Sequence, residues 1–278
     1  MGLREDEKLA IDICNNRIGF VPFRRIYTTS NEQLDAVFRG FDLKDKDILS
    51  VLGSSDHVFS EYYLGAKSVT AFDVNELTKY YYYLRKWSLI YRGVDVPYGN
   101  SKEWFLELLN EVLTKSELEE EALSFWKYLN KKAPNYTSKL FMGGISFNRR
   151  VPYENDLEGM TSIIEDRDID FSKINVFDFF DYDRTFDVVV LSNILDYAST
   201  PAALATCRDN LVDHLSDNGI VICSYVLSIY GDNDKNMLQK DIFSKSFEVV
   251  EGSSYSNPFY QTKLVPASYV YVKKECYQ

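Results

Sequence analysis

The 278-residue sequence contains few of the residues on which metal and thiol chemistry depend. Two histidines, His57 and His214, exclude a histidine-rich metal centre, and no Ser/His/Asp arrangement is visible. The cysteines are scattered without metal-ligand spacing, a usage typical of reduced thiols in a cytoplasm. There are four of them: Cys14, Cys207, Cys223 and Cys276. We therefore predict no metal site and make no assignment of a catalytic residue.

Positive charge and long apolar runs are also scarce. Lysine and arginine number 31 against 42 aspartates and glutamates, and the net charge of −11 argues against extended contact with nucleic acid. No apolar run reaches the length of a membrane span, and the first ten residues, MGLREDEKLA, lack the apolar core of a signal peptide. We expect a cytoplasmic protein without a transmembrane segment, whose partner is a small molecule.

The most informative segment is residues 47–75, which is predicted to form a strand, a tight turn with a single glycine, a helix and a second strand. The apolar run Ile48–Leu52 stops at Gly53, and Asp73 closes the second apolar run about 20 residues later. At this spacing a nucleotide-binding βαβ unit places a carboxylate against ribose hydroxyls, while the glycine admits the ligand close to the backbone. The alternative is a βαβ turn that binds nothing.

The missing glycines also narrow the choice of nucleoside. Dinucleotide-binding loops carry three glycines to admit a pyrophosphate, but here Gly53 is followed by Ser54 and Ser55, which a diphosphate would crowd. S-adenosylmethionine has no phosphate and tolerates such a loop. The segment therefore favours S-adenosylmethionine over NAD.

Alternating helices and strands predict the fold class. Helices are expected at 5–18, 32–38, 56–64, 75–91, 101–114, 116–131 and 201–215, and strands at 48–52, 68–74, 174–177, 186–191, 220–225, 247–250 and 269–273. This order is typical of a Rossmann-like, doubly wound, mostly parallel α/β sheet. We expect a single S-adenosylmethionine-binding domain over 1–278. Residues 77–156 exceed a simple crossover and are expected to form a helical insertion or cap.

Polar residues follow the third and fourth predicted strands, at the sheet edge where open α/β folds bind ligands. Asp178 and Phe179 follow the third strand, where a carboxylate can accept from an adenine amino group and an aromatic ring can pack on the base. Ser192 and Asn193 end the fourth strand, and Tyr197 is a candidate for lining the reaction centre. The alternative for Asp178 is an ordinary turn or helix cap.

In this order the motifs resemble class I S-adenosylmethionine-dependent transferases over 47–75 and 174–226, roughly half the chain. More narrowly, YTTSNEQLDAVF, the segment VLGSSDHVFSEYYLGAKSVTAFDVN and the helix ELTKYYYYLRKWSLI resemble bacterial proteins related to the 3-amino-3-carboxypropyl transferases of betaine-lipid synthesis. The loop departs from the usual methyltransferase pattern by lacking its second and third glycines. The resemblance implies S-adenosylmethionine contacts at Gly53, Ser54, Asp73, Asn75, Asp178 and Ser192, with Ser55 and Val74 beside them.

The resemblance also gives a role to Tyr27, Thr28 and Thr29, which could reach the methionine carboxylate and amine; a plain helix cap at Ser30 is the alternative. The expected activity is transfer of a methyl or 3-amino-3-carboxypropyl group to a small acceptor. A catalytically silent nucleoside-binding module and an NAD-dependent oxidoreductase are the other hypotheses. The tyrosines at 80–83 are expected to pack in the core, and Arg149 and Arg150 to lie on the surface.

Overall fold

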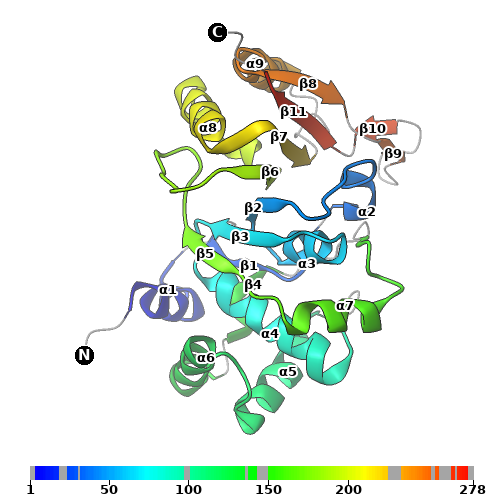
Figure 1. Ribbon diagram of the computed structural model, residues 1–278. Helices are drawn as coiled ribbons and strands as arrows, with labels where there is room; N and C mark the ends of the chain where they lie inside the picture. The colour runs from blue at the N-terminus through cyan, green and yellow to red at the C-terminus, as the bar shows by residue number, and fades with distance from the viewer. Residues whose placement is uncertain are drawn as a thin grey trace.

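A seven-stranded sheet organises the chain (Figure 1). The computed structural model describes residues 4–18, 24–30, 32–96, 101–134, 137–142, 150–224, 233–251, 254–256, 264–266 and 268–274. In chain order the strands of this sheet are β2 (Asp47–Val51), β3 (Ser68–Asp73), β5 (Asp170–Lys173), β6 (Phe186–Ser192), β7 (Leu215–Ser224), β8 (Phe247–Glu251) and β11 (Ser268–Lys273). Two further pairs are β1 (Ile26–Tyr27) with β4 (Phe141–Met142), and β9 (Ser254–Ser256) with β10 (Leu264–Pro266).

The sheet has the spatial order β5-β3-β2-β6-β7-β11-β8, in which β11 runs antiparallel to both of its neighbours. The other pairings are parallel, which confirms the predicted mostly parallel, doubly wound sheet. The chain leaves β2 toward β3 on one side and returns to β6 on the other, so the topological switch point lies between β2 and β6. Ligands of open α/β sheets bind at this point, beyond the carboxyl ends of the strands.

The helices are α1 (Glu5–Cys14), α2 (Leu34–Val37), α3 (Asp56–Tyr63), α4 (Leu77–Arg92), α5 (Ser101–Lys115), α6 (Glu120–Lys132), α7 (Leu157–Glu165), α8 (Pro201–His214) and α9 (Asn233–Phe243). Short 3-10 turns are η2 (Thr137–Leu140) and η3 (Ile194–Tyr197). Local signals set several helix ends. At the start of α8, the Thr200 side chain, directly before Pro201, accepts a hydrogen bond from the Ala203 amide. At the end of α4, Gly93 adopts a left-handed backbone conformation with φ +61°. Among the described residues no helix is long and apolar enough to span a bilayer.

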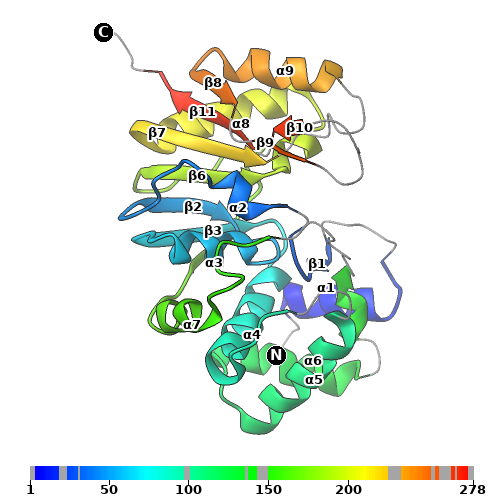
Figure 2. The ribbon, with the colours of Figure 1, turned by 90° about the vertical axis from the view of Figure 1, so that its right-hand side faces the viewer.

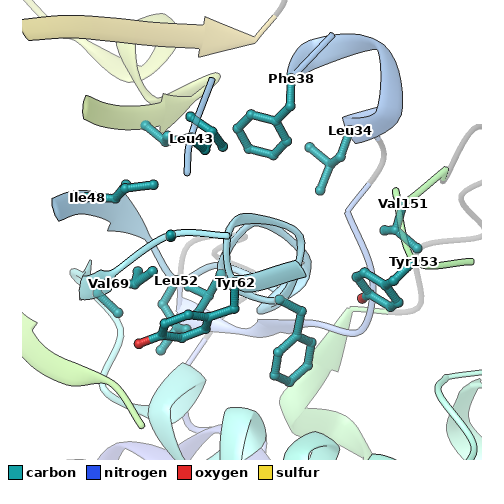
Figure 3. Packing of buried hydrophobic residues seen from close by; sticks show 14 of the residues in the cluster. Leu34, Phe38, Leu43, Ile48, Leu52, Tyr62, Val69, Val151 and Tyr153 are labelled. Carbon is teal, nitrogen blue, oxygen red and sulfur yellow. The ribbon is translucent and has the colours of Figure 1, made fainter. Parts of the chain in front are cut away.

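Both faces of the sheet are apolar, because successive strand residues alternate between two cores. Ile48 and Val188 pack under α2, α3 and α7, whereas their neighbours Leu49 and Val189 pack under α8 and α9. Figure 3 shows the first of these cores, in which Leu34 and Phe38 of the α2 region, Tyr62 of α3, and Val151 and Tyr153 lie around Ile48, Leu52 and Val69. The continuous apolar character of the central strands therefore follows from burial on both sides.

A third core lies outside the sheet. Figures 1 and 2 show α1, α4, α5 and α6 gathered beside the β5–β3 end of the sheet. Their apolar faces meet around Tyr80, Trp87, Phe105, Trp126 and Leu129, and Tyr80 stacks on Phe125 with ring centroids 4.0 Å apart. Tyr80, Tyr81 and Tyr82 are all buried, as helical packing requires. This helical layer is not made by residues 77–156 alone, because α1 also packs in its core. Helix α7, which begins directly after residue 156, packs on the sheet and not in this layer.

Two helices are shorter than predicted, because α1 ends at Cys14 and α6 begins only at Glu120. Three other elements differ from the structure as well. The third strand is β5, Asp170–Lys173, and not 174–177, which forms the loop after it. The helix predicted from Glu32 begins only at Leu34, and Gln33 at its N-cap makes no side-chain capping bond. The strand predicted at 220–225 is part of β7, which begins at Leu215. The sequence Asp217-Asn218-Gly219, typical of a turn, therefore lies within the strand, where Asn218 adopts φ +63° and the pairing with β6 is irregular. At these three places, contacts between segments distant in sequence decide the local structure, and the local sequence preference does not.

Candidate nucleoside site

A cavity of about 790 Å³ opens at the carboxyl ends of β2, β3, β5 and β6. Its wall combines the strand ends with the segment 24–32 and with α1. The residues that line it are Glu5, Asp6, Leu9, Arg24, Arg25, Tyr27, Thr29, Ser30, Glu32, Val51, Gly53, Ser54, His57, Phe72, Asp73, Val74, Asn75, Glu76, Thr78, Lys173, Ile174, Asn175, Val176, Phe177, Ser192, Asn193, Ile194 and Tyr197. The volume lies within the range of small-molecule sites in proteins.

The turn after β2 brings the backbone to the cavity wall. Gly53 adopts φ +48° and Ser55 φ +73°, and the Ser55 amide donates to the Leu52 carbonyl at 2.6 Å. A Cβ built on Gly53 would meet no atom within 4 Å, so the glycine faces open space. The left-handed conformation favours glycine, and the absent side chain leaves room for a ligand against the backbone.

Asp73 lies at the tip of β3, beside this turn. One carboxylate oxygen accepts from the Gly53 amide at 3.0 Å and the other from the Asn75 amide at 2.9 Å. Burial raises the pKa of Asp73 to about 6, although these amide hydrogen bonds act in the opposite direction. The Val74 amide and the Thr78 hydroxyl also hydrogen bond to this carboxylate, which lines the cavity.

Asp56, the first residue of α3, fixes the turn from behind the cavity wall. It is fully buried, accepts from the Ser30 amide at 2.6 Å and from the Ser54 hydroxyl at 3.1 Å, and pairs with Arg85 at 2.8 Å. Asp56 therefore ties the segment before α2 and the glycine turn to α4.

A second polar cluster, which sequence reasoning did not find, joins the ends of β6 and β7 to α3. Buried Glu32 accepts hydrogen bonds from Ser192 and from Ser224, the latter at 2.7 Å, and His57 Nε2 lies 2.7 Å from its carboxylate. Burial alone would raise the pKa of Glu32, but His57 and the two serine hydroxyls hold it below its usual value. No local signal marks the cluster, because Glu32 and Ser224 are 192 positions apart.

Two tyrosines lie near Asp73. Tyr27, in β1, is hydrogen bonded to Tyr197, which follows β6 and is 54% exposed. Burial, this hydrogen bond and the charge of Asp73 together raise the pKa of Tyr27 to about 12. The Tyr27 hydroxyl therefore stays protonated at neutral pH and can donate a hydrogen bond.

The structure brings most of the predicted site residues to one cavity. Its wall includes Tyr27, Thr29, Gly53, Ser54, Asp73, Val74, Asn75, Ser192, Asn193 and Tyr197. Their contact with a ligand stays a prediction.

Four predicted site residues do not line this cavity. Thr28 is buried and its carbonyl accepts from Tyr81, while Ser55 is buried within the turn. Asp178 accepts from the Asn175 side chain, and Phe179 is 79% exposed. Because β5 ends four residues before the predicted strand end, residues 174–177 lie at the cavity instead.

Two other side chains differ from expectation or lie outside the described residues. From the sequence, His214 is expected at an exposed position near a helix C-terminus. In the structure it is buried, and its ring nitrogens contact the Asn210 carbonyl and the Tyr182 amide, at 2.7 and 3.0 Å. Arg150 is exposed, and Arg149 falls outside the described residues.

Comparison with known proteins found similarity at the level of structure only. No protein-family model and no curated protein matches the chain. N-methyltransferase NodS from Bradyrhizobium japonicum WM9, in complex with S-adenosyl-L-homocysteine, is 9% identical with a TM-score of 0.41, over 87% of this chain and 84% of its own. A methyltransferase from Pyrococcus furiosus is 10% identical with a TM-score of 0.41, over 85% and 79%. The PH0226 protein of Pyrococcus horikoshii OT3 is 11% identical with a TM-score of 0.46, over 92% and 100%. Similarity of this degree does not assign the chain to a family.

Proposed function

We propose that the cavity binds S-adenosylmethionine and that the protein transfers part of it to a small acceptor. The observation that carries this proposal is the Asp73 carboxylate, held by the Gly53 and Asn75 amides beside an open glycine turn. Two vicinal ribose hydroxyls can donate to the two carboxylate oxygens, and charge-assisted hydrogen bonds of this kind are strong. The adenosine sugar then rests against Gly53.

The remaining wall supports the rest of the molecule. Val74, Ile174, Val176 and Phe177 form an apolar surface beside Asp73 that suits an adenine ring. Tyr27, Thr29 and Ser54 supply hydroxyl groups on another part of the wall, where they can hydrogen bond the amino-acid end. A bound sulfonium supplies a carbon that is already activated for transfer, so the protein's contribution is to hold the two reactants in line.

Two observations argue against a dinucleotide. The turn after β2 has Ser54 and Ser55 behind its single glycine, where a dinucleotide-binding loop has two further glycines. In addition, antiparallel β11 lies between β7 and β8, whereas dinucleotide-binding sheets have the strand order 3-2-1-4-5-6. The NAD-dependent oxidoreductase is therefore the weaker hypothesis.

The group transferred is a methyl or the 3-amino-3-carboxypropyl arm. Methyl transfer is the more common reaction of S-adenosylmethionine, whereas residues 27–38 and 51–90 resemble bacterial proteins related to the aminocarboxypropyl transferases of betaine-lipid synthesis, which favours the arm. The two reactions differ in which carbon next to sulfur faces the acceptor. Mass analysis distinguishes them: S-adenosylhomocysteine marks methyl transfer and methylthioadenosine marks transfer of the arm. A protein that binds S-adenosylmethionine and forms neither product is the silent binding module.

Calorimetry with S-adenosylmethionine, S-adenosylhomocysteine, NADH and ATP tests the proposal. We expect the first two to bind and Asp73→Ala to weaken both at least about tenfold, because two hydrogen bonds to a charged group are lost. Asp178→Ala, which removes a carboxylate outside the cavity, is the matched control and should bind as the wild type does. Tight NADH binding without binding of the sulfonium compound would reverse the order of the hypotheses.

A further inference from the structure

The cavity holds a titratable pair that nucleoside binding does not use. His57, on the first turn of α3, and Glu32, ahead of α2, both line the cavity, yet they are only 3% and 2% exposed. The Glu32 carboxylate accepts from His57, Ser192 and Ser224, which come from three different elements. Burial of a charged pair is costly, and a pair held this firmly orients the imidazole.

The two nitrogens of His57 have different environments. Nε2 lies 2.7 Å from Glu32, so this nitrogen carries the proton and donates it to the carboxylate. Among the described residues Nδ1 has no hydrogen-bond partner, and it is not one of their fully buried unpaired atoms, as expected for an atom on the cavity wall that His57 lines. In many group-transfer enzymes, one imidazole nitrogen is hydrogen bonded to a carboxylate and the other nitrogen takes a proton from the reactant.

We propose that His57 is the general base of the transfer reaction, that Glu32 positions it, and that the acceptor is an amine. This inference rests on the proposed function. Among the groups that line the cavity, five are acidic (Glu5, Asp6, Glu32, Asp73 and Glu76) and four are basic (Arg24, Arg25, His57 and Lys173), with Lys173 shared between Glu5 and Glu76. An ammonium ion suits this surplus. An ammonium ion has a pKa of about 10, whereas an alcohol, like water, has a pKa of about 16. An imidazole base can therefore remove a proton from an ammonium ion far more readily than from an alcohol.

The step balances in atoms and electrons. The ammonium acceptor gives one proton to Nδ1 of neutral His57, and the freed nitrogen lone pair attacks the carbon attached to the sulfonium. The new N–C bond forms as the C–S bond breaks, and the pair from that bond stays on sulfur as a neutral thioether. The product leaves as an alkylated ammonium, and the imidazolium releases its proton to water.

The charges around His57 determine the pH at which it can act. Burial alone would lower the pKa of His57, but Glu32 beside it, and Glu61 and Asp56 on α3, raise it above its usual value. His57 is a base only when neutral, so turnover should rise with pH along a limb set by this pKa. Removing the charge of Glu32 should move that limb to lower pH.

Nuclear magnetic resonance tests this without turnover, because the chain has two histidines. His57→Gln assigns the signals. With S-adenosylhomocysteine bound, we expect His57 to titrate above about 6.5 and Glu32→Gln to lower its midpoint by about 1–3 pH units. Glu61→Gln is the matched control: Glu61 is equally buried, but burial raises its pKa to about 7, so it carries less charge and should move the midpoint much less. Equal midpoints in wild type and Glu32→Gln would overturn the positioning role.

Turnover tests the base and the acceptor class. Putrescine, ethanolamine and benzylamine are compared with 1,4-butanediol, ethylene glycol and benzyl alcohol, and S-adenosylhomocysteine plus methylthioadenosine is measured. We expect the amines alone to raise product formation, and His57→Gln to lower kcat by about 100-fold or more and to remove the pH limb, while S-adenosylhomocysteine binds as before. A retained rate and limb in His57→Gln, or no preference for amines, would overturn this inference alone. Absence of S-adenosylmethionine binding to the wild type would overturn the proposed function instead.

Discussion

Replacing Arg85 with methionine should destabilise the protein more than any surface substitution. Arg85, on α4, is fully buried, and one of its nitrogens lies 2.8 Å from Asp56 and 2.7 Å from Asp95. The same guanidinium donates to the Ser54 carbonyl in the glycine turn and lies 5.0 Å from the centre of the Phe59 ring. Arg85 therefore neutralises two buried carboxylates and fixes the loop that forms one wall of the site.

The expected cost follows from what Arg85→Met leaves behind. Breaking a buried ion pair by removing one partner costs about 3–5 kcal/mol, because the other charge stays buried without its counterion. For a chain of this size, that corresponds to a fall in melting temperature of about 6–20 °C. The neighbouring carboxylates also keep the pKa of Arg85 above its usual value, so in the wild type this guanidinium is charged at every accessible pH.

Urea unfolding of the wild type, Arg85→Met and Arg92→Met measures the difference. Arg92 lies on the same helix and pairs with Glu111 at 2.5 Å, but both side chains are partly exposed. Its removal should cost less than about 1 kcal/mol, because exposed pairs contribute little. Equal midpoints for the two variants would refute the claim that the buried network supports the glycine turn. A folded Arg85→Met that binds S-adenosylhomocysteine as tightly as the wild type would refute it as well.

Three further predictions concern the ligand contacts. Because Asp73 has a pKa of about 6, S-adenosylhomocysteine affinity measured by calorimetry should fall as the pH drops below that value, and Asp73→Asn should remove this dependence. Gly53→Ala should cost about 1–2 kcal/mol in urea unfolding and also weaken binding, whereas Gly93→Ala, at a similar φ of +61°, should cost stability alone. Phe177→Ala should weaken binding about three- to tenfold through loss of packing on adenine, while Phe179→Ala, at an exposed position, should bind as the wild type does. A pH-independent affinity, tight binding by Gly53→Ala, or a larger effect at Phe179 would each contradict its prediction.

Much of the fold can be predicted because its signals are local. The run Ile48–Leu52, the stop at Gly53 and the second apolar run place β2, α3 and β3 within one residue of the observed bounds. The third strand could not be placed in this way. β5 is a short edge strand of four residues with none fully buried, so its pattern is weak. Residues 174–177 are more apolar than β5 because they line the cavity, and this made them resemble a strand.

In the candidate site too, some residues can be predicted from local sequence and others cannot. Asp73 and Gly53 are found from spacing, because a strand and a helix of ordinary length separate them. Glu32 and His57 come together only when segments distant in sequence meet at the carboxyl ends of β6 and β7. Local reasoning placed Glu32 on a helix, and only the tertiary structure shows its carboxylate buried against two serines and an imidazole.

The most direct test of the proposed nucleoside site is a crystal structure of the protein with S-adenosylhomocysteine. We expect both ribose hydroxyls within hydrogen-bond distance of the Asp73 carboxylate and the sugar in contact with Gly53. A nucleoside bound elsewhere, or this edge of the sheet filled by the protein's own side chains, would contradict the assignment.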